Sequence, residues 1–175
     1  MNLAAYLAWA AIGTELWAGK FGGTGLIPAA LLWPLLIALH LGFLALFLAR
    51  QLLDLRDRGA IAAVAAQFAV AIAMAMLSRE STVPILLVVA AAQLAQLLPV
   101  PVLAVVWLAT NALMYWIYRE LWSWTAPAMA TLLHGSFQLF AMVASWYAVT
   151  SQRARDALAT AHAELLATRS LLAES

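Results

Sequence analysis

The sequence contains no cysteine and few charged residues. Its 175 residues include 9 Lys and Arg and 8 Asp and Glu, so charged side chains make up only 10% of the chain. The missing cysteine excludes disulfide bonds, thiolate metal sites and cysteine nucleophiles. The formal net charge of +1 offers no basic surface, so we expect no nucleic-acid partner. Hydrophobic residues reach 66%, against roughly half in a soluble domain. This excess predicts that the lipid bilayer itself is the partner of the chain.

Polar faces are also missing from the longest apolar stretches. The run from Ile27 to Ala49 has no polar side that could form the exterior of a water-soluble core. Transmembrane strands alternate apolar and polar residues over about ten positions, whereas these runs are continuously apolar. In lipid, the backbone groups of a non-alternating segment are satisfied only in a helix. The sequence therefore predicts an all-α fold, a polytopic bundle of membrane helices.

Six apolar runs predict about six transmembrane helices, separated by short connections that contain Gly, Pro or charged residues. The first run carries Glu15 near its end, so an interfacial helix is the alternative interpretation there and would leave five spans. Because the connections are too short to hold another domain, a ligand would have to bind inside the bundle or on its surface. The runs are Leu3–Gly19, Ile27–Ala49, Ala60–Leu77, Val83–Leu98, Val102–Tyr118 and Ala126–Thr150.

The distribution of Lys and Arg predicts the orientation. With a cytoplasmic C-terminus, six of these residues lie inside and three outside, as the positive-inside rule favours, and the N-terminus is then cytoplasmic too. No basic residue precedes the first apolar run, so we expect no cleavable signal peptide and a multi-pass protein of the inner (plasma) membrane. Trp17, Tyr115, Trp116, Tyr118, Trp122 and Trp124 then form an outer interfacial belt. The inner residues are Arg50, Arg56, Arg58, Arg153, Arg155 and Arg169, and the outer ones are Lys20, Arg79 and Arg119.

After Thr150 the chain becomes polar and rich in alanine, without Gly or Pro. We therefore divide it into a transmembrane bundle, residues 1–150, and a cytoplasmic relay helix, residues 151–175, that continues unbroken from the last span. Leucines recur every seven residues, each preceded four positions earlier by a small residue, as in the seam of a dimeric coiled coil. An amphipathic tail on the inner leaflet is the alternative, although the basic face of such tails is missing. The seam predicts a homodimer and consists of Ala154, Leu158, Ala161, Leu165, Thr168 and Leu172.

The layout as a whole is similar to one known family. Several short hydrophobic segments lead into AHAELLATRSLLAES at residues 161–175, and the fourth segment contains PILLVVAAAQL at residues 84–94. This combination resembles the membrane sensor region of DesK/NarL-type sensor histidine kinases. The resemblance implies the sensory input half of a bacterial two-component kinase, which relays a membrane or small-molecule cue through its C-terminal helix.

In that family the helix leads to a phosphoacceptor histidine and an ATP-binding domain, and the 175 residues contain neither. His162 lacks the acidic and basic neighbours of a phosphoacceptor. The helix also reaches Ser175 without a stop signal, so we expect the chain to be the input part of a longer kinase. The resemblance then implies that ATP, Mg²⁺ and a response regulator bind the kinase core. We expect no catalytic residue, cofactor or metal site in this chain.

Polar side chains within the apolar runs are candidates for sensing, because ionisable groups are costly in a membrane. Interhelical hydrogen bonding, worth about 0.6 kcal/mol on average, is the alternative for each of them. A haem held by His40 and His134 is not expected, because the predicted topology separates the two by roughly 8 Å in depth. The candidates are His40, Asn111, His134 and Gln138, and further polar positions are Glu15, Gln67, Gln93 and Gln96.

No arrangement of nucleophile, base and acid points to an enzyme. Ser136 does not stand in a nucleophile elbow, and the spacing of Glu80 and Glu120 suggests no shared metal. The alternative function is a small multi-pass transporter or channel subunit, which the intramembrane polar residues favour. No inverted repeat or pair of broken helices supports it.

Overall fold

The computed structural model describes residues 2–18, 22–53 and 57–174, and in this part the chain is helical and forms no strand. The predicted all-α fold is confirmed. An isolated bridge between Gly23 and Ser78 is the only strand-like pairing of the described residues. The elements are α1 (Asn2–Trp17), α2 (Ala29–Leu52), α3 (Asp57–Leu77), α4 (Ile85–Leu94), α5 (Val100–Trp116), the π-helical turn η1 (Ile117–Leu121) and α6 (Pro127–Glu174).

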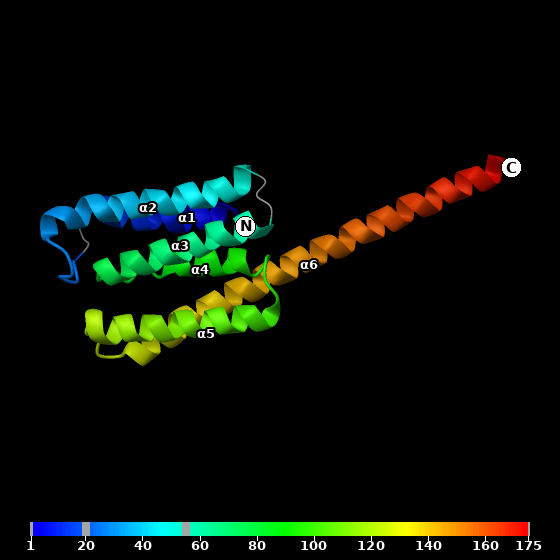
Figure 1. Ribbon diagram of the computed structural model, residues 1–175. Coiled ribbons are helices and arrows are strands. Elements are labelled where there is room, and N and C mark those ends of the chain that lie inside the picture. Colours follow the sequence, from blue (N-terminus) through cyan, green and yellow to red (C-terminus); the bar gives the residue numbers. More distant parts are fainter. Residues whose placement is uncertain (1, 19–21, 54–56, 175) are drawn as a thin grey trace.

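Helices α1 to α5 and the first part of α6 form one bundle, and the rest of α6 extends far beyond it (Figure 1). Successive helices run in opposite directions along the bundle. Helix α2 packs along α3, and α4 contacts both α3 and α6. The N-terminus lies at the end of the bundle from which α6 leaves. We call this the exit end and the opposite one the closed end.

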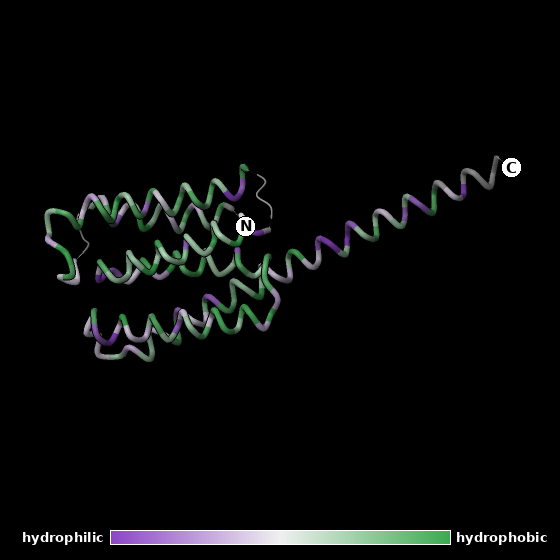
Figure 2. The backbone as a smooth tube through the Cα atoms, in the orientation of Figure 1, coloured by the Kyte–Doolittle hydropathy of each residue, from purple (hydrophilic) through white to green (hydrophobic). Residues whose placement is uncertain are grey.

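Four of the described helices are long and apolar enough to cross a membrane: α2, α3 from Arg58, α5 with its continuation to Leu121, and α6 as far as Leu166. Hydrophobic residues dominate the bundle, whereas polar residues recur along the protruding part of α6 (Figure 2). Large apolar side chains also cover the outside of the bundle; Leu132 is 71% exposed and Phe140 73%. Because extensive apolar surface is unfavourable in water, these features indicate a membrane protein.

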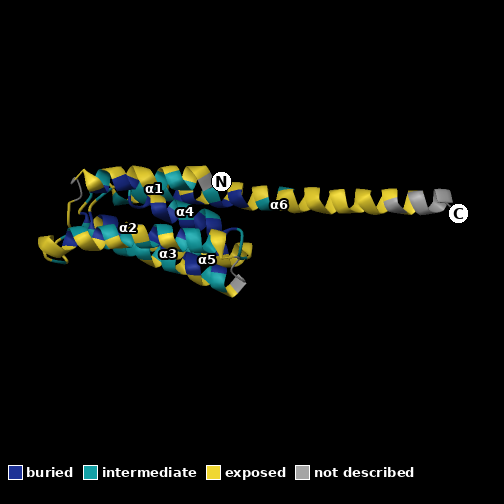
Figure 3. Cartoon of the chain, turned by 90° about the horizontal axis from the view of Figure 1, so that it is seen from above, coloured by how far each residue is buried: buried dark blue, intermediate teal, exposed yellow. Residues whose placement is uncertain are grey.

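Helix α4 is shorter than the predicted run from Val83 to Leu98. It has 10 residues, or about 15 Å of helix, and single hydrogen-bonded turns continue the chain at both of its ends. Pro84 precedes it, and Pro99, which has no amide hydrogen, separates it from α5. By its length alone α4 does not cross a hydrocarbon core of about 30 Å. Most of its side chains are buried, so it is an internal helix of the bundle (Figure 3).

Helix α6 is continuous over 48 residues, which corresponds to about 72 Å. The predicted unbroken passage from the last apolar run into the polar tail is confirmed. Its first part packs against α4 and α5, while residues 152–166 are exposed throughout (Figure 3). One rigid element therefore belongs both to the bundle and to the protruding tail.

The closed end is held together by hydrogen bonds between its connections. The backbone amide of Arg79 donates to the carbonyl oxygen of Gly22 at 2.8 Å, which pairs the connection before α2 with the connection before α4. The hydroxyl of Thr82 donates to the Glu15 carboxylate at 2.9 Å. The last turn of α1 is thereby fixed against the same connection.

Two members of the predicted aromatic belt are buried instead. Tyr118 is 0% exposed and Trp122 3%, and the indole of Trp122 donates to the carbonyl oxygen of Ala75 at 2.9 Å. The turn η1 and the left-handed residue Ser123, with a φ of 53°, reverse the chain between α5 and α6. This reversal directs the two rings into the bundle, so the belt prediction is wrong for both of them.

Gly135 marks a close approach of α5 and α6. A Cβ added to Gly135 would lie 2.6 Å from Oδ1 of Asn111, and the amide of Asn111 is held by Trp107 and Gln138. The indole of Trp107 also donates to the Gly135 carbonyl oxygen at 3.0 Å. Gly42 in α2, by contrast, has open space where its Cβ would lie. Only the first glycine is required by packing.

We expect Gly135→Ala to destabilise the bundle by about 1–3 kcal/mol, since the added methyl group would displace Asn111 from its partners. Gly42→Ala should leave the stability unchanged or raise it by up to about 1 kcal/mol, because alanine favours a helix over glycine. Thermal unfolding of the purified chain in detergent, followed by circular dichroism, measures both. Equal unfolding temperatures would contradict the close approach.

Candidate functional site

A network of polar side chains crosses the bundle near the exit end. The guanidinium of Arg50, in the last turn of α2, donates to the side-chain oxygens of Gln93 at 2.8 Å and of Gln96 at 3.1 Å. Gln93 in turn donates to Gln67 in α3 at 2.7 Å. Gln96, in the turn after α4, donates to the hydroxyl of Ser145 in α6 at 2.9 Å. The network therefore joins α2, α3, α4 and α6.

Most of this network is removed from the surface. Gln67, Gln93 and Ser145 are at most 3% exposed, and Arg50 is half-buried. Hydrogen bonds are stronger in such surroundings, and a buried polar group without a partner is costly. The described residues provide no hydrogen-bond partner for Nε2 of Gln67. Arg50 thus has two hydrogen-bond partners in the network, whereas Gln67 has none for its Nε2 among the described residues.

A cavity of about 630 Å³ adjoins the network. It lies beside α4 and is walled by α1, α2 and α6. Small apolar side chains form most of its lining, among them Ala5, Ala8 and Ala144, and Arg50 and Gln96 lie at its polar part. The cavity therefore combines an apolar interior with one cation.

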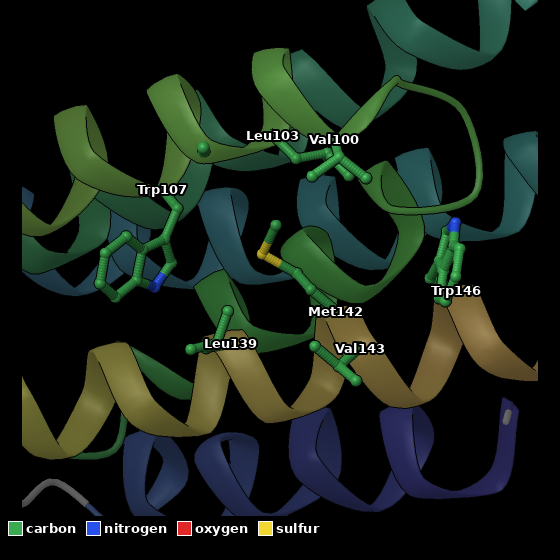
Figure 4. A pocket seen from close by; sticks show the side chains of 8 residues that line it. Val100, Leu103, Trp107, Leu139, Met142, Val143 and Trp146 are labelled. Atoms are coloured by element: carbon green, nitrogen blue, oxygen red, sulfur yellow. The ribbon is translucent and has the colours of Figure 1, made fainter.

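A second cavity, of about 360 Å³, lies between α5 and α6 and is lined almost entirely by apolar groups (Figure 4). Trp107 and Leu103 of α5 lie on one side of it, and Leu139 and Met142 of α6 on the other. It presents no charged group. In a bilayer, hydrocarbon chains would fill such a groove without specific recognition.

Two of the predicted sensing residues, Asn111 and Gln138, bond to each other. The amide of Asn111 donates to Oε1 of Gln138 at 3.1 Å and to the carbonyl oxygen of Trp107 at 2.8 Å. Both side chains are buried, and Nε2 of Gln138 has no hydrogen-bond partner among the described residues. This contact is interhelical hydrogen bonding between α5 and α6.

His134 belongs to an aromatic group at the closed end. Its Nδ1 lies 3.1 Å from the Tyr118 hydroxyl and 2.9 Å from the carbonyl oxygen of Ala130. Tyr118 stacks on Trp124 with ring centroids 4.9 Å apart, and Trp122 packs beside both rings. The group joins η1 to the start of α6.

His40 lies elsewhere, between α1 and α2. Its buried ring stacks on Trp9 with centroids 4.5 Å apart, and the indole of Trp9 donates to the His40 carbonyl oxygen at 3.0 Å. Neither ring nitrogen has a hydrogen-bond partner in the described part of the chain. The structure thus places His40 and His134 in separate contacts. No three His, Cys, Asp or Glu residues within the described ranges are arranged to hold a metal ion.

The predicted seam of the relay helix is exposed in the single chain. Leu158 is 72% exposed and Leu165 64% on the protruding part of α6. The side chain of Leu172 lies outside the described residues. The remaining seam positions, all exposed, are Ala154, Ala161 and Thr168.

Two members of the polar network were not selected from the sequence. Arg50 is predicted to belong to the charged connection after the second run, but it lies within α2 and bonds to side chains of the bundle. Ser145 is not singled out in the sequence at all. The signal that could have found the network is the spacing of Gln93 and Gln96, because residues three apart share one side of a helix.

No protein-family model matches the chain, and neither curated proteins nor solved structures include a similar one. Its function therefore has to be inferred from the helices, the polar network and the cavity.

Replacement of Gln93 tests the network. Gln93→Met keeps the side-chain length but removes the acceptor for Arg50 and the donor to Gln67, so we expect a loss of about 1–2 kcal/mol of stability. Gln152→Met is the matched control, because Gln152 bonds to Asp156 within the exposed tail. Thermal unfolding in detergent measures both. A Gln93→Met protein as stable as the control would show that the network does not support the bundle.

Proposed function

We propose that the chain is the membrane sensory input domain of a bacterial two-component sensor histidine kinase. In this proposal it crosses the inner membrane several times with both termini in the cytoplasm. Helix α6 relays a membrane or small-molecule cue to a kinase core, which binds ATP, Mg²⁺ and the response regulator. The proposal is supported by the resemblance of the layout and of residues 161–175 to DesK/NarL-type sensors, and by the geometry of α6.

The continuity of α6 is the observation that carries the proposal. Ser145 and Gln138 are buried in the bundle, and Leu158 and Leu165 are exposed on the same uninterrupted helix. The bundle part of α6 packs against α4 and α5. Because a helix is stiff, any rotation of its bundle part turns the exposed part with it.

The distribution of charge supports a cytoplasmic exit end. Arg58, Arg153 and Arg155 belong to the exit end or to the tail beyond it, and Arg79 and Arg119 belong to the closed end. Positive residues favour the cytoplasmic side of a membrane protein. Both the N-terminus and the tail then face the compartment that contains a response regulator.

In a homodimer, the seam of α6 in one chain would pack against the same seam in the second chain. A coiled coil of about three heptads is marginal when isolated, because short helices gain little from their own hydrogen bonds. Dimerisation would cover Leu158 and Leu165, and contacts between bundles in the membrane would add to it. The seam would then respond to small changes in the bundle rather than being permanently locked.

Cysteine cross-linking tests the seam, since the chain has no cysteine of its own. Ala161→Cys places a thiol on the seam, and Ala163→Cys places one on the opposite side of the same exposed helix. Under mild oxidation in membranes, we expect Ala161→Cys to form several times more disulfide-linked dimer on a non-reducing gel. Equal amounts from both variants would contradict a paired seam and favour a tail that lies on the membrane.

Helical phase tests the relay itself. The chain would be fused in heptad register to a dimeric histidine kinase core, and one to seven residues would be inserted after Thr150. Two added residues turn the tail by about 200°, whereas seven restore its phase to within about 20°. We expect autophosphorylation with labelled ATP to vary with insert length and to recover at seven. Output independent of the insert would contradict the relay and favour a transporter or channel subunit.

A further inference from the structure

The cavity beside α4 is open on one side and has the size of a ligand site. Small-molecule sites hold roughly 300–1,000 Å³. This cavity measures about 630 Å³. Its volume results from small residues on three helices, such as Ala8 in α1, Ala92 in α4 and Ala144 in α6. The apolar walls would accept a hydrocarbon chain.

Arg50 gives this cavity a charge. The side chain uses two of its five N–H donors for Gln93 and Gln96, and both of these partners are neutral. Among the described side chains the only ion pair is that of Arg119 with Glu120, at the closed end. The side chains of Asp54 and Asp57, the acidic residues nearest in sequence, lie outside the described part.

The two amides also fix the direction of the guanidinium. Gln93 and Gln96 accept from different terminal nitrogens of Arg50, so the plane of the group is set before any ligand arrives. A planar, pre-oriented guanidinium matches the oxygens of a phosphate better than a flexible ammonium does. The half-buried position also strengthens its attraction for an anion.

We propose that the cavity binds one anionic phospholipid, with its phosphate on Arg50 and part of an acyl chain along the alanine-lined wall. The bilayer is the source of the ligand, because the cation lies in the last turn of a helix long enough to span a membrane, near the expected depth of the headgroups. Basic pockets between membrane helices on the cytoplasmic side recognise anionic headgroups. A zwitterionic lipid would also fill the apolar part of the cavity. Its headgroup carries a cation of its own, which would weaken the attraction of its phosphate to Arg50.

The site also has a connection to α6, and this consequence rests on the proposed function, whereas the binding does not. Gln96 accepts from Arg50 at 3.1 Å and donates to Ser145 at 2.9 Å, and the Ser145 hydroxyl donates to the Ala92 carbonyl oxygen at 2.6 Å. A phosphate that draws Arg50 towards it would loosen the Arg50–Gln96 bond. Gln96 is bonded directly to α6, so occupancy of the cavity would change how α6 is held.

Native mass spectrometry of the purified full chain, titrated with phosphatidylglycerol, phosphatidylcholine or oleate, tests the binding. We expect one phosphatidylglycerol to be retained with about tenfold higher affinity than phosphatidylcholine. Arg50→Gln should abolish that preference. Arg58→Gln, which removes an equal charge from an exposed position at the same end, should preserve it.

A second pair of variants tests the apolar part without touching Arg50. Ala144→Leu should reduce retention of both phospholipids several-fold by occupying the cavity, and Ala128→Leu, on the same helix but outside the cavity lining, should not. Circular dichroism establishes that each variant is folded. If Arg50→Gln does not fold, the preference of the unmodified chain and the effect of Ala144→Leu still decide the outcome.

Three results would overturn the site: equal retention of the two phospholipids by the unmodified chain, equal loss of preference in Arg50→Gln and Arg58→Gln, or retention of oleate without phosphatidylglycerol.

The link to α6 is measured separately, as Ala161→Cys cross-linking in nanodiscs with and without phosphatidylglycerol. Lipid-selective retention with unchanged cross-linking would keep the lipid site and reject its connection to the relay. If the unmodified chain does not retain phosphatidylglycerol, but kinase output in the fusion still varies with insert length, the lipid site is rejected and the relay is not.

Discussion

Hydrogen bonding from the C-terminal part of α4 is the interaction on which the exit end depends. Gln93 and Gln96 reach α3 and α6, and both accept from Arg50 of α2. Apolar packing alone would leave these helices free to slide, because lipid chains are as apolar as leucine side chains. Directional bonds between buried side chains fix one arrangement. A helix of only 10 residues and the turn after it can therefore organise three longer neighbours.

The two ends of the bundle differ in how tightly their elements are joined. At the closed end, Trp122, Tyr118 and Thr82 have defined partners, and the connections are bonded to one another. At the exit end, a cavity lies between α1 and α6. Regions with fewer packed contacts open at lower free energy. Under the proposed relay, we therefore expect the exit end, where α6 leaves, to open more easily than the closed end.

Much of this architecture could be predicted from hydropathy, because apolar runs and their punctuation determine where membrane helices start and end. The all-helical fold and the unbroken α6 were accessible in this way. The short α4 was not, since Val83–Leu98 is apolar apart from Gln93 and Gln96, and only tertiary packing decides which part closes regular helical bonds. Tyr118 and Trp122 were misplaced because their burial depends on the turn η1, for which the sequence carries no known signal. Arg50 was misplaced because a cation at the end of an apolar run resembles a loop residue until its partners on another helix are known.

The length of α6 converts small angles into large displacements. The part beyond Thr150 is about 36 Å long, so a tilt of about 5° at the exit end moves its far end by about 3 Å. In the proposed relay, α6 would act as a lever that pivots near the hydrogen bond from Gln96 to Ser145, so a small tilt of its bundle part would displace the far end of the tail by more.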